Sequence, residues 1–321
     1  MSSPMEDEIV VALDWTPNTN HSGFYVAQVK LCSADAGDGT TPARQVAQRA
    51  AHFAVAPSES AVSFATTEPD KPRLVAVAAL LQGSASAICT LKSSGIDRPA
   101  KLAGKRYASY NGRFEDPIVS RMVSNDGGDG QSVQFHGLDA HGYQDDDTMG
   151  AGSVVASYLE KGRSDSTWIF PAWEGVLAER AGQHLHCFGL EDYGIPYGYS
   201  PVLLAHPDDL VGPQAERVKA FLAATAEGYR RAAAGPEEAA KALASCGHPS
   251  LKDPEFLEAS SSCIAKQFLT PDGKWGFMDS KRWDDFVNFL CLSGIVRDRA
   301  GGAIPREAIK VESLFTNHFL P

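Results

Sequence analysis

The segment Ile9-Val10-Val11-Ala12-Leu13-Asp14-Trp15-Thr16-Pro17-Asn18 decides the fold class. Its first five residues form a short apolar run, which is typical of a strand buried on both faces. A polar turn follows, and the apolar residues Phe24-Tyr25-Val26-Ala27 indicate the start of a helix. A buried strand, a turn and a helix in this order form the repeating unit of α/β proteins.

The same alternation continues along the chain. Apolar runs predict strands at 53–56, 74–81, 87–91, 106–110, 167–170, 185–188 and 202–205, with helices at 42–51, from 57–60 onward, and at 98–103, 118–123, 154–159 and 174–180. After residue 210, one-sided helical spacing appears at Val218, Phe221, Leu222, Thr225 and Tyr229, and again at Trp283, Phe286, Val287 and Leu290. We therefore predict α/β layers with mainly parallel sheets.

Composition narrows the function classes. The chain has 321 residues, enough for about two domains, and 43% of them are hydrophobic. The net charge of −11 and the lack of a basic patch exclude a typical nucleic-acid-binding protein. Six scattered cysteines without a CxxC pair give no metal-site pattern, so we expect no metal.

The N-terminal residues suggest a location. Met1-Ser2-Ser3-Pro4-Met5-Glu6-Asp7-Glu8 is acidic and lacks the apolar run of a secretory signal. No stretch approaches the roughly 18 apolar residues needed to cross a bilayer, so we expect no membrane insertion. The sequence therefore predicts a cytoplasmic protein, with a transporter as partner only if the chain is exported.

Three segments together carry a family resemblance. Asp14-Trp15-Thr16-Pro17-Asn18, with His21 and Phe24-Tyr25-Val26-Ala27, resembles the opening of thiamine-pyrimidine-precursor binding proteins. Leu91-Lys92-Ser93-Ser94-Gly95-Ile96 and Lys101-Leu102-Ala103-Gly104-Lys105 resemble the start of the second lobe in sulfonate-, nitrate- and thiamine-precursor-binding proteins. Asp192-Tyr193-Gly194-Ile195-Pro196-Tyr197-Gly198-Tyr199 resembles the end of that lobe in the precursor binders.

This resemblance implies a fold and a function. The fold is the two-lobed periplasmic-binding-protein type II fold, with a ligand cleft between the lobes. Lobe one would comprise 1–91 plus 201–321, and lobe two 92–200. The implied partner is a small aminopyrimidine that is a thiamine precursor, bound without a cofactor and linked to thiamine biosynthesis or salvage. The lobes are expected to close on the ligand.

An enzyme of the same superfamily, the thiamine pyrimidine synthase, is the alternative. It uses pyridoxal phosphate and needs a lysine and a histidine in the segment that matches Phe53 to Ser60, together with a clustered-cysteine motif. This chain has Ala56 at the lysine position and Ser60 at the histidine position, and the matching tyrosine-rich segment has no cysteine. These departures favour a binding protein with no catalytic residue.

A second departure from the family lies between Lys30 and Thr40, where only about nine residues remain. Either the first lobe lacks one strand or the sequence is shortened at this point.

Polar and aromatic residues beside the predicted strand ends form the candidate ligand site. Ligands of α/β sheets bind beyond the carboxyl ends of the strands. The predicted set is Trp15, Asn18, Ser58, Glu59, Ser60, Tyr110, Asn111, Arg113, Glu174, Tyr193, Tyr197 and Tyr199.

Each of these residues has a structural interpretation beside the functional one. Trp15 either stacks on a flat ring or plugs the strand end. Glu174 either accepts hydrogen bonds from an aminopyrimidine or is an acid favoured by the helix dipole. The tyrosines either contact the ligand or pack at the hinge. Ser58 and Ser60 either bind a polar substituent or cap a helix, and Arg113 either meets a phosphate or is a solvated loop residue.

Overall fold

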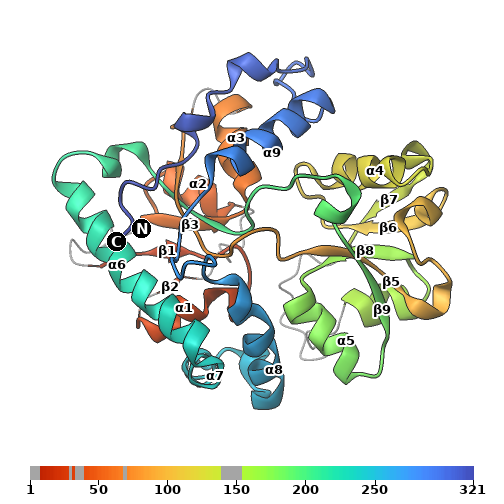
Figure 1. Cartoon of the computed structure of the whole chain (residues 1–321), viewed down its shortest axis with the longest axis horizontal. Coiled ribbons are helices and arrows are strands. Elements are labelled where there is room, and N and C mark those ends of the chain that lie inside the picture. Colours follow the sequence, from red (N-terminus) through yellow and green to blue (C-terminus); the bar gives the residue numbers. More distant parts are fainter. Residues whose placement is uncertain (1–7, 29–30, 33–39, 68–70, 139–153) are drawn as a thin grey trace. The chain divides into compact units, whose positions relative to one another are not determined.

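The computed structural model describes residues 8–28, 31–32, 40–67, 71–138 and 154–321 (Figure 1). These residues belong to two compact units. Unit 1 consists of Met1–Ser84 and Gly198–Pro321, and unit 2 consists of Ala85–Tyr197. The chain therefore leaves unit 1 once, builds all of unit 2 and returns. Each unit combines a sheet with helices, as the α/β prediction requires.

Unit 1 contains, within its described residues, a five-stranded sheet of order β2-β1-β3-β10-β4. The strands are β1 (Val11–Ala12), β2 (Leu31–Cys32), β3 (Phe53–Ala56), β4 (Val75–Ala79) and β10 (Val202–Ala205). The helices are α1 (Ser22–Val26), α2 (Pro42–Ala47), α3 (Ser58–Thr66), α6 (Pro213–Ala234), α7 (Pro236–Ala244), α8 (Pro254–Ile264) and α9 (Ser280–Leu292).

Unit 2 contains, in the part that the structure describes, a five-stranded sheet of order β7-β6-β8-β5-β9. The strands are β5 (Ala87–Leu91), β6 (Arg106–Ser109), β7 (Gln134–Gly137), β8 (Ser166–Ile169) and β9 (Leu185–Gly189). The α-helices are α4 (Glu115–Asn125) and α5 (Val176–Arg180), and two short π-helices, Val155–Glu160 and Pro171–Gly175, lie beside several 3-10 turns.

Both sheets run mainly parallel, as predicted, but each contains one reversed strand among its five described strands. In unit 1, β1 is parallel to β2 and β3, but β10 is antiparallel to β3 and β4. In unit 2, β6 is parallel to β7 and β8, but β5 is antiparallel to β8 and β9. The reversed strands are β5, which is the first strand of unit 2, and β10, which is the first strand after the chain returns to unit 1.

Two short edge strands were not predicted. β2 contains only Leu31 and Cys32, and it pairs with β1. The first lobe therefore does not lack this strand, which corrects one of the two alternatives for the short segment before Thr40. β7 is the sequence Gln-Phe-His-Gly, whose residues are all at least partly exposed. A polar strand on a sheet edge shows no apolar run, so hydrophobicity does not reveal it.

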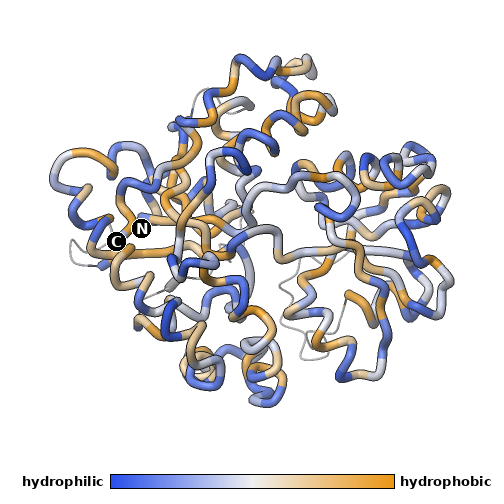
Figure 2. The backbone as a smooth tube through the Cα atoms, viewed as in Figure 1, coloured by the Kyte–Doolittle hydropathy of each residue, from blue (hydrophilic) through white to orange (hydrophobic). Residues whose placement is uncertain are grey.

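The core of unit 1 joins α1 and α6 to the sheet, and hydrophobic residues run along its strands (Figure 2). The predicted face of α6 is buried at all five of its positions. From this face, the Phe221 ring stacks on Phe53 with centroids 4.3 Å apart. Gly23 and Gly228 bring α1 and α6 into backbone contact, because a Cβ on Gly228 would lie well under 3.0 Å from the Gly23 carbonyl oxygen.

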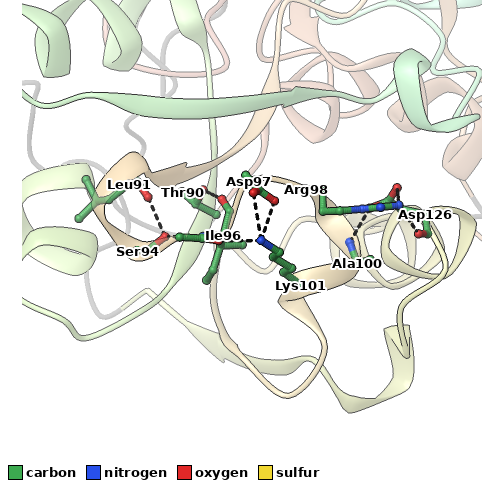
Figure 3. A network of polar contacts seen from close by, with 10 residues as sticks. Thr90, Leu91, Ser94, Ile96, Asp97, Arg98, Ala100, Lys101 and Asp126 are labelled. Carbon is green, nitrogen blue, oxygen red and sulfur yellow. Dashed lines mark hydrogen bonds and ion pairs between the residues drawn. The ribbon is translucent and has the colours of Figure 1, made fainter.

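A polar network holds the turn after β5 (Figure 3). Thr90 Oγ1 donates to the Ile96 carbonyl at 2.6 Å, and Ser94 Oγ donates to the Leu91 carbonyl at 2.6 Å. Farther along, Arg98 forms a two-pronged ion pair with Asp126 just beyond the carboxyl end of α4. This segment is the one that resembles the start of the second lobe, and its hydroxyl and charged residues fix the path of the chain into the unit.

Candidate ligand-binding site

The carboxyl ends of β1 and β3 form the candidate site of unit 1. These strands are parallel neighbours, with Val11 opposite Phe53 and Ala12 opposite Ala54. Their carboxyl ends therefore lie at one edge of the sheet, and the turns that follow them, 14–18 and 57–60, lie close together. Trp15 is half-buried in the first turn. A tryptophan in this position has a ring partly accessible at the edge where α/β sheets bind ligands.

Beside Trp15, a buried histidine orients an aspartate. The Nδ1 atom of His21 accepts from the backbone N–H of Asn18 at 3.3 Å, which leaves the proton on Nε2. His21 Nε2 then donates to Asp14 Oδ1 at 3.0 Å. The His21 side chain is fully buried, while 27% of the Asp14 side chain is exposed. Asp14 was absent from the predicted site residues, although its place directly after the first strand could have indicated it.

Asn18 has a local structural role. Its Oδ1 accepts from the backbone N–H of Asn20 at 2.9 Å, and its Nδ2 donates to the Thr16 carbonyl at 3.0 Å. The side chain thus caps the short 3-10 helix that begins at Thr19. The structure places Asn18 beside Trp15 in the chain, but with its amide occupied by its own turn.

Ser58 joins α3 to the segment that returns from unit 2. Its Oγ accepts from the backbone N–H of Tyr199 at 3.1 Å, and its own N–H donates to the Tyr199 carbonyl at 2.9 Å. Gly198 is required at this contact, because a Cβ there would lie 2.5 Å from Ser58 Oγ. Of the two neighbouring predicted residues, Glu59 is buried and Ser60 is half-buried at the start of α3.

Tyr199 is buried within unit 1. Its hydroxyl accepts from the backbone N–H of Asp279 at 2.8 Å, and its ring lies against Trp283 and beneath the Arg282 guanidinium. These contacts correspond to the packing interpretation of this tyrosine.

The main candidate residue of unit 2 is Glu174. It lies in the π-helix Pro171–Gly175 after β8, and only 3% of it is exposed. Its Oε2 accepts from the backbone N–H of Phe170 at 2.9 Å. Among the described residues, no lysine or arginine pairs with this carboxyl group. Burial raises the pKa of Glu174 to about 7, against the smaller lowering effect of backbone hydrogen bonds.

The structure brings Tyr110 to Glu174. Tyr110 follows β6, and its half-buried side chain packs against the core cluster that contains Cys89, Ala108 and Tyr158. Burial, followed by the negative charges of Glu174 and Glu115, raises the pKa of the Tyr110 phenol well above its usual value. A protonated phenol and a carboxyl group of intermediate pKa therefore lie near each other at the end of this sheet.

The loop after β6 is held by Glu115, a buried residue that the sequence interpretation missed. Glu115 Oε1 accepts from the Tyr107 hydroxyl at 2.9 Å and from the Tyr110 N–H at 3.2 Å, and its Oε2 accepts from the Gly112 N–H at 3.0 Å. Burial raises the pKa of Glu115, and these hydrogen bonds oppose that shift. Its position in the first turn of a helix behind a Tyr-Asn-Gly turn was the available signal.

Asn111 and Arg113 lie in this same loop. Asn111 has a positive φ of 57° and donates its N–H to Ser109 Oγ at 3.0 Å. The side chains of Asn111 and Arg113 are exposed. The Asn111 amide lies against β7, because a Cβ on Gly137 would be 2.7 Å from its Nδ2.

Tyr193 and Tyr197 lie elsewhere in unit 2. The Tyr193 carbonyl accepts from Asn125 Nδ2 at the carboxyl end of α4. This helix has 11 residues, so its ends are ~16 Å apart, and Tyr110 lies at the other end. Tyr197 is buried with its ring edge-on to Trp168, 6.0 Å between centroids. Side chains alternate along a strand, so Trp168 points to the sheet face opposite that of Thr167 and Ile169. Tyr197, which contacts Trp168, therefore lies on the opposite face from the Ile169 cluster against which Tyr110 packs.

Comparison with known proteins gives the family. The family model described as NMT1/THI5 like matches residues 18–239. The chain belongs to the NMT1/THI5-like family. It is 24% identical to a formylaminopyrimidine-binding protein of Halalkalibacterium halodurans, over 88% of this chain and 84% of that protein. It is 22% identical to a putative thiamine biosynthesis protein of Haemophilus influenzae, over 96% of this chain and 93% of that protein.

Solved structures confirm the fold of this NMT1/THI5-like chain. The alkanesulfonate-binding protein of Xanthomonas axonopodis pv. citri has a TM-score of 0.66 at 13% identity, covering 98% of this chain and 99% of that chain. The periplasmic aliphatic sulphonate-binding protein of Escherichia coli has a TM-score of 0.56 at 16% identity, covering 79% and 84%. The predicted solute-binding fold is therefore shown.

These neighbours bear on location as well. They include periplasmic proteins, so they give no support to the predicted cytoplasmic location. In the part of the chain that the structure describes, no helix has the length and apolar character needed to cross a membrane.

Proposed function

We propose that this protein binds a thiamine-pyrimidine precursor, an aminopyrimidine, without transforming it. Membership of the NMT1/THI5-like family and the similarity to a formylaminopyrimidine-binding protein support this proposal. The single observation that carries it is Glu174, a buried carboxyl group at the end of β8 that lacks a cationic partner among the described residues. Such a group is costly to bury alone, and a ligand that offers complementary hydrogen bonds offsets this cost.

The chemistry of Glu174 fits an aminopyrimidine edge. This edge presents an amino donor beside a ring nitrogen, which is an acceptor when the ring is neutral. A protonated carboxyl group donates one hydrogen bond and accepts another, so it matches the neutral ring. An ionised carboxylate matches the protonated ring, and these bonds are charge-assisted. With a pKa of about 7, Glu174 needs little free energy to adopt either state at neutral pH.

Trp15 would stack on the aromatic ring of the ligand, as the family resemblance implies. Among the predicted tyrosines, the half-buried Tyr110 is a better candidate for a ligand contact than Tyr199, whose hydroxyl is already bonded to Asp279. The predicted lobe limits, 1–91 with 201–321 and 92–200, remain part of the proposal. The roles of Asn18, Ser58, Glu59, Ser60, Asn111, Arg113, Tyr193 and Tyr197 as ligand contacts also remain predictions.

We further propose that the protein acts with a membrane transporter as the receptor of an import system. Its structural neighbours include a ligand-binding component of an ABC-type import system from Staphylococcus aureus, which supports such a partner. In this proposal the protein works outside the cytoplasm, in place of the location predicted from its N-terminal residues.

Calorimetric titration of Glu174→Ala tests the binding proposal. Removing the acceptor leaves the ligand amine unsatisfied, which costs about 1–3 kcal/mol, so binding should weaken roughly tenfold to a hundredfold. The titrants are the hydroxymethyl pyrimidine of thiamine, its phosphate and the formylaminopyrimidine. Glu179→Ala is the matched control, because Glu179 is an exposed acid in the next turn of the chain. If Glu174→Ala remains folded and binds like the unmodified protein, the pyrimidine assignment loses its main residue.

The synthase alternative makes a different spectroscopic prediction. Pyridoxal phosphate forms an internal aldimine with an enzyme lysine, but Ala56 occupies the matching position and no lysine among the described residues is buried. Incubation with pyridoxal phosphate should therefore produce no stable aldimine absorbance band. A stable band that disappears when one lysine is replaced would instead support the enzyme.

A further inference from the structure

We propose that Cys89 and Cys187 form a reversible disulfide that joins β5 to β9. The two residues face each other in the antiparallel register of these strands. Both thiols are free in the structure, Cys89 buried and Cys187 exposed. The inference is independent of the ligand proposed above.

The hydrogen-bonding pattern of β5 and β9 favours a cross-link between Cys89 and Cys187. Lys92 donates its N–H to the His184 carbonyl at 2.8 Å, which continues the same register by one pair. Hydrogen-bonded and non-hydrogen-bonded pairs alternate along an antiparallel ladder. Counting back from Lys92, Cys89 and Cys187 are a non-hydrogen-bonded pair. Such pairs have a Cα separation of about 4.5 Å, within the range of roughly 4.4–6.8 Å that disulfides accept.

The two side chains also share one face of the sheet. Cys89 belongs to the buried cluster that contains Ala108 and Ile169, and Leu91 and Leu185, the next pair on that face, pack against the same cluster. Residues directly opposite in an antiparallel pair point to the same side. Burial, and secondly the charge of a Cys187 thiolate, raises the pKa of Cys89, which agrees with two adjacent sulfur atoms.

The turn after β5 supports the orientation of Cys89 on its strand. Thr90, the neighbour of Cys89, donates its Oγ1–H to the Ile96 carbonyl, and Ser94 closes the same turn onto Leu91 (Figure 3). These bonds hold Thr90 on the face opposite to the one that Cys89 shares with Leu91, because side chains alternate along a strand.

Oxidation requires an external disulfide and proceeds in two exchanges. β9 is the edge strand of the sheet, so the exposed Cys187 reacts first. Its thiolate attacks the small-molecule disulfide RSSR, which gives a mixed disulfide and releases one RS⁻ that takes up a proton. The Cys89 thiolate then attacks the Cys187 sulfur and releases the second RS⁻, which is also protonated. Two protein thiols become one disulfide, and one RSSR becomes two RSH.

The cross-link would tie the first strand of unit 2 to its last. β5 begins two residues after the start of the unit, and β9 precedes its end, so the closed loop contains almost the whole unit. A disulfide that closes a long loop restricts the unfolded chain most. The oxidised protein should therefore melt at a higher temperature, and an oxidising compartment would keep it in this form.

The test is oxidation of the full chain with oxidised glutathione, followed by non-reducing peptide mapping and thermal melting. The expected results are a cross-linked peptide that contains Cys89 and Cys187, a loss of two hydrogen atoms from the intact mass, and a rise in melting temperature that dithiothreitol reverses. Cys263→Ser, which removes an exposed cysteine of α8, should keep all three results. Cys187→Ser should lose them.

Two outcomes would overturn the proposal. One is a stable glutathione adduct on Cys187 without the cross-linked peptide, because the second exchange would then not occur. The other is a melting temperature that rises equally in oxidised Cys187→Ser, because the stabilisation would then arise from another cysteine.

Discussion

Glu174 is the predicted site residue whose surroundings the structure defines most fully, while its role as a ligand contact stays a prediction. The prediction placed an acid at a helix start behind a buried strand, and the structure shows it nearly inaccessible, with its pKa raised by burial. An ordinary first-turn acid would be ionised and solvated, with its pKa lowered by the helix dipole. At Glu174 the effect of burial on the pKa outweighs that of the helix terminus, although its Oε2 accepts from the N–H of Phe170, the residue that caps this helix.

This pKa shift predicts a pH-dependent effect of Glu174→Gln on stability. The folded state favours the protonated form, so its stabilising contribution is complete below pH 4.5, is lost as the pH rises through about 7, and then stays constant. Glutamine does not ionise. The variant should therefore gain melting temperature relative to the unmodified protein between about pH 5 and about pH 8. A melting-temperature difference that does not change with pH would mean that Glu174 is ionised throughout.

Other site residues show why residue roles were harder to predict. Ser58 has the local pattern of an anion-binding or capping serine, yet its hydroxyl accepts from Tyr199, 141 positions away in the chain. Tyr199 in turn bonds to Asp279. No local pattern reveals which distant segment lies opposite a side chain. Asn18 differs, because its cap is local, and the capping preference of asparagine could have indicated it.

At the scale of elements, α6 and α1 approach each other through glycine. Intrinsic helix propensity predicts that Gly228→Ala stabilises α6 by roughly 0.5–1 kcal/mol. The structure predicts the opposite, because the new Cβ would clash with the Gly23 carbonyl oxygen. Forced overpacking costs about 1–3 kcal/mol, so the net free energy of unfolding should fall.

Urea denaturation checks this prediction about helix packing. Ala224→Gly, at an exposed position of the same helix, is the control and should cost about 1 kcal/mol through propensity alone. If Gly228→Ala proves more stable than the unmodified protein, α1 and α6 are not in backbone contact.

Apolar strands were predicted well, because burial on both faces leaves a continuous hydrophobic run. The structure confirms β3, β5 and β10 at the predicted residues 53–56, 87–91 and 202–205. The reversal of β5 and β10 could not be predicted in this way, because hydrophobicity is the same for parallel and antiparallel neighbours. The mixed sheets follow from the chain path, which sequence periodicity does not encode.

At the scale of the whole molecule, the sheet of unit 1 needs a strand whose residues follow unit 2 in the sequence. β10 lies between β3 and β4 and hydrogen-bonds to both. Residues 1–84 alone would leave β3 and β4 without a common neighbour. Unit 2, in contrast, takes all its described strands from one continuous segment.

A chain that ends at Ser200 should therefore fold in only one of its two parts. Hydrogen exchange should show β5, β6, β8 and β9 protected as in the full protein, and β3 and β4 unprotected, because local stability follows completed packing. A shorter chain that ends at His184 lacks β9 and is the control, in which protection of β5 should also fall. Equal protection of β3 in the Ser200 chain and the full protein would contradict the prediction.

The central position of β10 also sets an order of events on the ribosome. The N-terminal segment is translated first, but it must wait for residues 202–205 before its sheet closes. At about 5–20 residues per second, this delay is on the order of ten seconds. The segment translated second can complete its fold during that time. Until β10 emerges, the apolar edge of β3 is open to pairing with other nascent chains, so the growing polypeptide is most vulnerable to aggregation while the later-made unit is already formed.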